Sequence, residues 1–121
     1  MKAVIDSDVL IDYLQGIDKA RLEINRYSAP LYSIISWMEV MCGADTSEEQ
    51  EAAEALFGSM KRVELSQKVA ARAVQIKKEQ KLKLPDAIIL ASADTEGCIL
   101  VTRNTKDFDP SDPRVRVPYS V

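Results

Sequence analysis

Two apolar runs, at opposite ends of the sequence, each stop in polar residues. Ala3-Val4-Ile5 is followed by Asp6-Ser7-Asp8, and Ile99-Leu100-Val101 is followed by the polar segment 102–107. Short apolar runs bounded in this way are typical of buried strands. Parallel strands bring their carboxyl ends to one edge of a sheet, and open α/β sheets bind ligands at that edge. We therefore expect acidic side chains to gather there.

Predicted strands alternate with predicted helices along the whole sequence. We expect strands at residues 2–6, 31–34, 62–65, 98–101 and 115–117. We expect helices to begin at Ser7 or Asp8, at Asp18, at Ser36, at Ser47 with a capping box to Gln50, at Ser66 and at Pro85. This alternation predicts parallel pairing. The predicted fold is one α/β domain over residues 1–121, with a central parallel sheet of about four to five short strands flanked by helices.

The composition excludes several kinds of site. The chain has no histidine, which excludes Ser-His triads and most zinc sites. Cys42 and Cys98 lack metal-ligand spacing, so we expect them to be reduced and packed. No apolar stretch approaches the roughly 20 residues that span a bilayer. The start of the chain does not resemble a signal peptide. We therefore expect no membrane association and a cytoplasmic location.

Charge is distributed unevenly between the two halves. Net charge is −3, which argues against a nonspecific nucleic-acid coat. Residues 1–60 carry 4 basic and 11 acidic side chains, whereas residues 61–121 carry 12 basic and 8 acidic ones. The basic half includes the run Lys77, Lys78, Lys81 and Lys83. This run predicts either a local positive face or a solvated helix surface.

Several carboxylates are candidates for binding a divalent cation, and each has a structural alternative. Mg²⁺ and Mn²⁺ prefer oxygen ligands and need no histidine. Asp6 is the strongest candidate, although it also suits a helix N-cap. Glu39 also fits a capping box with Ser36. Asp86 complements a helix dipole, and Asp107 lies in a polar loop where acids are usually solvated.

Four blocks of the sequence, taken in order, resemble a known family. They are residues 4–11 (VIDSDVLI), 36–40 (SWMEV), 84–93 (LPDAIILASA) and 100–108 (LVTRNTKDF). The second and third are generic alone, but the ordered set is specific and spans nearly the whole chain. The chain is similar to PIN domains of the VapC toxin type. The resemblance implies a Mg²⁺- or Mn²⁺-dependent endoribonuclease from a type II toxin–antitoxin system.

The resemblance also implies partners, a mechanism and a set of site residues. The expected partners are an RNA substrate, a cognate antitoxin and a second copy in a homodimer. The expected mechanism is cleavage of RNA phosphodiester bonds by a metal-activated water. The implied metal ligands and catalytic residues are Asp6, Glu39, Asp86 and Asp107. Asp8, Thr102 and Asn104 are implied as supporting residues, with Arg103 and Lys106 contacting substrate phosphates. Asn104 and Asp107 compete for the fourth acidic position, which varies in the family.

Three alternatives use the same residues differently. Ile5-Asp6-Ser7-Asp8-Val9 resembles the nucleophile motif of haloacid-dehalogenase-like phosphohydrolases, in which Asp6 would attack phosphate and Asp8 would act as acid and base. A receiver domain would need an aspartate after the third strand, where this chain has Glu64-Leu65-Ser66. A third alternative is an interaction module that keeps the fold without the activity.

Overall fold

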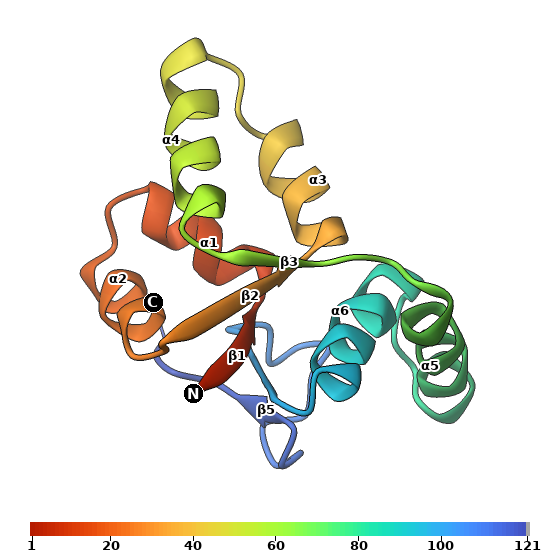
Figure 1. Cartoon of the computed structure of the whole chain (residues 1–121). Coiled ribbons are helices and arrows are strands. Elements are labelled where there is room, and N and C mark those ends of the chain that lie inside the picture. The colour runs from red at the N-terminus through yellow and green to blue at the C-terminus, as the bar shows by residue number, and fades with distance from the viewer. Residues whose placement is uncertain (121) are drawn as a thin grey trace.

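A five-stranded parallel sheet lies at the centre of the computed structural model, which describes residues 1–120. The strands are β1 (Lys2–Ile5), β2 (Ala29–Ser33), β3 (Lys61–Val63), β4 (Ile99–Val101) and β5 (Val115–Arg116). Their order across the sheet is β3-β2-β1-β4-β5, with every neighbouring pair parallel. The predicted α/β fold is confirmed, and β1 is its central strand (Figure 1).

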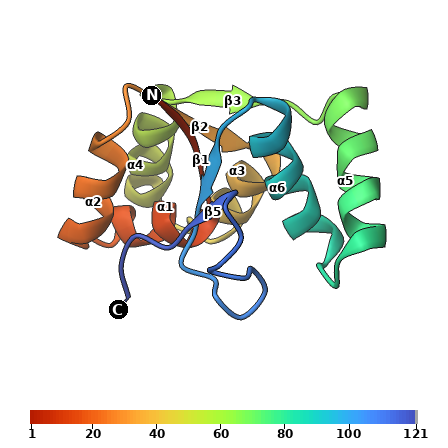
Figure 2. The same ribbon diagram turned by 90° about the horizontal axis from the view of Figure 1, so that it is seen from below.

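The helices cover both faces of the sheet (Figure 2). They are α1 (Ser7–Leu14), α2 (Asp18–Asn25), α3 (Ile34–Cys42), α4 (Ser47–Gly58), α5 (Gln67–Glu79) and α6 (Leu84–Thr95). Successive side chains of a strand point to opposite faces, and β1 follows this rule. Val4 packs with α5 and α6, whereas Ala3 and Ile5 pack with the cluster that contains α1, α2 and α4. Within residues 1–120, no helix combines the length and the apolar character that crossing a bilayer requires.

Helix starts differ from the predicted ones in ways that bear on the candidate site. Asp6, rather than Ser7 or Asp8, occupies the N-cap of α1. α3 begins at Ile34 behind the N-cap Ser33, and Ser36 is fully buried inside the helix, so the predicted Ser36–Glu39 capping box is wrong. The capping box of α4 is formed by Thr46 and Glu49, one residue earlier than predicted. The side chain of Cys42 is exposed rather than packed.

Candidate active site

Asp6 and Thr102 meet where β1 and β4 end. Ile5 pairs with Val101 in the sheet, and the backbone N–H of Asp6 donates to the carbonyl of Val101 at 2.9 Å. The Thr102 hydroxyl then donates to Asp6 Oδ2 at 2.7 Å, while the Ser7 backbone N–H donates to Oδ1 at 2.7 Å. The Asp6 carboxylate is therefore held by two donors in a fixed orientation, and its capping role does not exclude a functional one.

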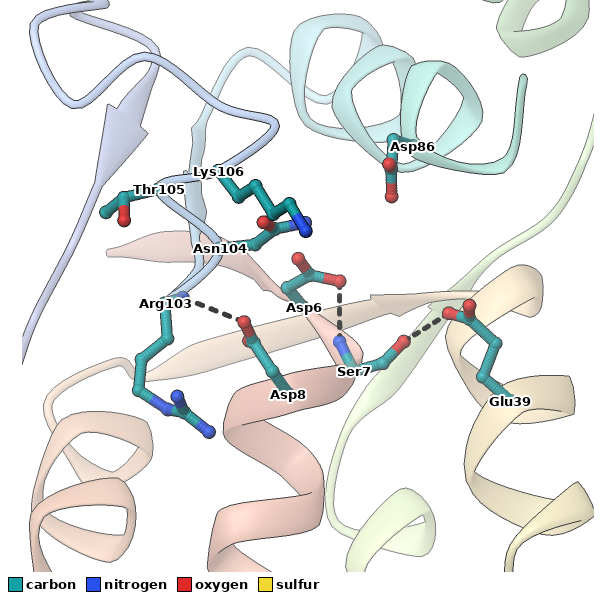
Figure 3. A pocket seen from close by; sticks show the side chains of 9 residues that line it. All are labelled: Asp6, Ser7, Asp8, Glu39, Asp86, Arg103, Asn104, Thr105 and Lys106. Carbon is teal, nitrogen blue, oxygen red and sulfur yellow. Dashed lines mark hydrogen bonds between the residues drawn. The ribbon is translucent and has the colours of Figure 1, made fainter. Parts of the chain in front are cut away.

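A hollow of about 410 Å³ opens at this edge of the sheet. It is lined by Asp6, Ser7, Asp8, Glu39, Asp86, Arg103, Asn104, Thr105 and Lys106. These residues come from the end of β1, from α1, α3 and α6, and from the loop after β4 (Figure 3). Four of the predicted carboxylates thus share one hollow. Asp107, the fifth, does not line it.

Asp86 and Glu39 reach the hollow from two helices. Asp86 lies in the first turn of α6, directly after Pro85, and its side chain points toward Asp6 from the opposite side (Figure 3). Glu39 lies on α3 and is exposed. The Ser7 hydroxyl donates to Glu39 Oε1 at 2.5 Å and lies 3.0 Å from the Ser36 hydroxyl. Glu39 is therefore oriented by Ser7 and does not face the interior.

Asp8 lies beside Asp6 and is incompletely satisfied. Its Oδ2 accepts from the Arg103 backbone N–H at 3.1 Å. Its Oδ1 is buried and has no hydrogen-bond partner among residues 1–120. Burial of the Asp8 side chain raises its pKa. A buried oxygen without a partner is costly, so a positive charge or a donor at this position would stabilise Asp8.

The surroundings of Asp6 disfavour the ionised form of its carboxyl group. Burial, the neighbouring charge of Asp8 and, more weakly, the charge of Asp86 raise its pKa from 3.8 to about 7. The hydrogen bonds from Thr102 and Ser7 act in the opposite direction without outweighing them. Negative charge at this edge is thus under-compensated, which is the electrostatic condition that favours binding of a cation.

The ionised form of Asp86 is disfavoured in the same way. Burial raises its pKa, and the charges of Asp107 and Glu39 raise it further, whereas Lys83 lowers it. Asp107 therefore influences the site although it lies outside the hollow. Its Oδ2 accepts from Asn104 Nδ2 at 2.9 Å, and its backbone N–H donates to Asn104 Oδ1 at 3.2 Å. Asn104 faces the hollow, and Asp107 is bonded to it.

The Arg103 side chain does not point toward the hollow (Figure 3). Its Nε and one terminal nitrogen donate to the two Asp12 oxygens at 2.6 and 3.0 Å. The Tyr119 hydroxyl donates to the same carboxylate at 2.8 Å. The phosphate contact by Arg103 stays a prediction, and the bond of its guanidinium to a buried carboxylate competes with it. Asp12 and Tyr119 were not predicted; Asp12 stands four residues after Asp8, a spacing that places both on one face of α1.

The donor set fits a hard divalent cation rather than zinc. Every acidic side chain in the hollow offers oxygen, and the buried Asp8 Oδ1 finds no partner in the described part of the chain. Across residues 1–120, no three acidic or cysteine side chains lie close enough to form a ready-made cage for a metal. Mg²⁺ usually binds through one or two carboxylates and keeps several of its waters, so it does not require such a cage. The site therefore fits Mg²⁺ or Mn²⁺ with an incomplete protein shell.

Comparison with known proteins gives concordant results. The sequence profile described as "PIN domain" matches residues 3–109. Ribonuclease VapC10 from Mycobacterium tuberculosis is 31% identical over 126 residues, covering 98% of this chain and 93% of that protein. The structure titled toxin-antitoxin complex from Klebsiella pneumoniae superposes with a TM-score of 0.91 at 38% identity, covering 98% and 99% of the two chains. DNA-bound VapBC from Salmonella typhimurium superposes with a TM-score of 0.81 at 22% identity, covering 96% of each chain.

Proposed function

The chain belongs to the PIN domain family, and we propose that it is a metal-dependent endoribonuclease, the toxin of a type II toxin–antitoxin pair. The family predicted from the four sequence blocks is confirmed by the profile match. The observation that carries the proposal is the convergence of Asp6 and Asp86, 80 residues apart in the sequence, on one acidic hollow. The name of the VapC10 relative, a ribonuclease, supports RNA as substrate.

In this proposal Asp6 and Asp86 hold a Mg²⁺ or Mn²⁺ ion, with Asp8 and Glu39 completing the negative surroundings. When bound, such an ion lowers the pKa of the attacking water and stabilises charge on the transferring phosphate. Support comes from the raised pKa of Asp6 and from Asp8 Oδ1, which has no partner within residues 1–120; a cation would relieve both. Asp107 contributes through its charge and through its bonds to Asn104.

The protein's own groups orient these carboxylates and the substrate. Thr102 and the Ser7 backbone fix the Asp6 carboxylate, so its oxygens need little reorganisation on binding. The Ser7 hydroxyl fixes Glu39, which is exposed and keeps one oxygen free of Ser7. Glu39 is accordingly our candidate for accepting the proton of the attacking water. Lys106 and the Asn104 amide face the hollow and supply donors for a phosphate.

The proposed partners follow from the related structures. The Klebsiella neighbour belongs to a toxin-antitoxin complex, which supports a cognate antitoxin for this chain. The homodimer implied by the sequence resemblance stays a prediction, and sedimentation of the purified chain tests it. Neither the phosphohydrolase nor the receiver alternative is supported by the profile match, which is to the PIN domain.

Cleavage of RNA by matched variants tests the proposal. Purified protein is incubated with total RNA, with Mg²⁺ or with chelator, and the cut ends are mapped. We expect cleavage with Mg²⁺, none in chelator, and none for Asp6→Asn or Asp86→Asn. Asp18→Asn is the control because Asp18 is exposed and, within residues 1–120, pairs only with Arg21 on the surface of α2. Cleavage by the Asp6→Asn and Asp86→Asn variants at the rate of the parent protein would refute the assignment.

A further inference from the structure

Arginines and lysines of this protein differ in how they are neutralised. In residues 1–120 each arginine lies within 4.0 Å of a carboxylate oxygen in a salt bridge. Among the lysines of the same part of the chain, only Lys2 forms such a bridge. Positive charge that is free to bind an anion is therefore carried by lysines, and their positions show where an anion would be attracted.

Five of these free lysines lie at one end of the molecule. Lys77, Lys78, Lys81 and Lys83 surround the turn between α5 and α6 and line a hollow of about 560 Å³. Lys106 lies on the loop after β4 and lines the acidic hollow. All five are exposed. Figure 2 shows the α5–α6 turn and the loop after β4 at the same end of the fold. We call these five residues the lysine rim.

The lysine rim lies next to the acidic site. Lys83 is the N-cap residue of α6, three positions before Asp86, and its charge lowers the pKa of Asp86. Lys77 and Lys78 occupy the last turn of α5, where cations complement the helix dipole. The dipole does not account for Lys81, Lys83 or Lys106, none of which lies in a C-terminal helical turn. The helix dipole therefore does not explain why so many lysines lie beside the acidic hollow.

We propose that the lysine rim is the surface that binds the RNA backbone, carrying the strand from the acidic hollow across the α5–α6 turn. This inference rests on the proposed ribonuclease function and names the surface that presents the substrate. An acidic hollow repels a polyanion, so attraction must come from beside it. With Arg103 bound to Asp12, the lysine rim supplies that attraction.

Lysine suits a role in backbone binding that is independent of sequence. Its ammonium is a point charge on a flexible stem, so it follows phosphates without fixing their geometry. Each phosphate contact releases counterions, and the logarithm of the affinity for single strands falls with the logarithm of salt with a slope of about −0.7 per contact. Loss of three contacts should reduce the slope by about 2 and weaken binding roughly 100-fold near 0.1 M salt.

Two triple variants with equal charge change test the surface. The rim variant carries Lys77→Gln, Lys78→Gln and Lys81→Gln, which leaves Lys83 in place beside Asp86. The control variant carries substitutions at three exposed lysines away from the turn, none of them in a salt bridge within residues 1–120: Lys19→Gln, Lys61→Gln and Lys68→Gln. Fluorescence anisotropy measures the Kd for a labelled single-stranded RNA over a series of salt concentrations, in chelator so that the RNA stays intact.

The rim variant should bind RNA up to 100-fold more weakly near 0.1 M salt, with the shallower slope, whereas the control should match the parent within a few-fold. Lys81→Glu alone, in the turn outside both helices, should also weaken binding without altering thermal unfolding. In Mg²⁺, cleavage of a long RNA at low concentration should be slower in the rim variant than in the parent, and unchanged in the control variant.

Two results of the binding measurement would overturn the lysine rim: an unchanged Kd and salt slope for the rim variant, or an equal loss of affinity in the control. Failure of the proposed function has a different signature. If the parent protein binds RNA through the rim but cleaves none in Mg²⁺ or Mn²⁺, the RNA-binding surface is supported and the nuclease function is refuted. If long RNA is cleaved equally by the parent and the rim variant, the nuclease function is supported and the RNA-binding surface is refuted.

Discussion

Replacing Asp6 by asparagine should stabilise the metal-free protein while abolishing cleavage. Asp6 is 5% exposed and ionises against burial, the charge of Asp8 and, more weakly, that of Asp86. Asparagine keeps the shape and one carbonyl oxygen, so the Ser7 backbone N–H retains its acceptor. The Thr102 hydroxyl can rotate to accept from the new amide. The substitution therefore removes a disfavoured charge and retains most of the hydrogen bonding.

The size of the effect follows from the pKa of Asp6. A pKa raised from 3.8 to about 7 means that the folded state binds this proton more tightly than the unfolded state does. The stabilisation of the folded state by protonated Asp6 is then fully present below pH 3.8 and is lost as pH rises through about 7. The full loss corresponds to about 4 kcal/mol at about pH 8, and to less than half of that near pH 5. Asp6→Asn does not undergo this loss.

Urea unfolding in chelator measures the difference. Asp6→Asn should be more stable than the parent at about pH 8, by up to 4 kcal/mol, and the gain should shrink near pH 5. Asp18→Asn, on the exposed surface of α2, should change stability little at either pH. Equal or lower stability of Asp6→Asn at the higher pH would refute the reasoning, because the Asp6 carboxylate would then not be a disfavoured charge.

Three further predictions concern groups around the hollow. Arg103→Gln and Asp12→Asn should show a coupling of about 2 kcal/mol in a double-mutant cycle of urea unfolding, since two hydrogen bonds join a guanidinium to a buried carboxylate; additive effects would contradict the pairing. Burial raises the pKa of Glu23, but the bonds from Arg116 and Tyr27 outweigh it and hold the pKa below 4.5, so this contribution to stability exists above pH 4.5 and is lost as pH falls below it. Glu23→Gln should therefore lose less stability than the parent on acidification through that range, and parallel losses would contradict the assignment. Glu39→Gln should reduce RNA cleavage roughly 100- to 10,000-fold while leaving unfolding unchanged, and an unaltered rate would exclude a role for that carboxylate.

The fold was predictable because strand and helix signals repeat along the chain. All five strands were expected in their observed places, with ends shifted by at most two residues. Periodicity locates an element, but the exact cap depends on which side chain reaches a free N–H. Ser36 has the right spacing from Glu39 for a capping box, yet it is buried inside α3, and Ser33 caps the helix instead. Local sequence does not distinguish these two serines.

The sequence predicted which acidic residues line the site, but not where every side chain points. Asp6 and Asp8 were expected at the carboxyl edge of the sheet because they follow a buried strand, whereas Glu39 and Asp86 were implied by the family resemblance. All four share the hollow. The direction of a long side chain depends on distant partners. Arg103 lies in the polar segment just after β4, which suggested a contact with substrate, but Asp12 from α1 binds its guanidinium. The pairing of positions 12 and 103 is a tertiary contact that no local pattern encodes.

Binding of Mn²⁺ tests most directly whether Asp6 and Asp86 share one cation. Isothermal titration of the purified protein with Mn²⁺ reports binding without reference to cleavage. The account predicts that the parent and Asp18→Asn bind Mn²⁺ with the same affinity, and that Asp6→Asn and Asp86→Asn each abolish the binding. Mn²⁺ binding that survives unchanged when Asp86 is replaced would contradict a shared site.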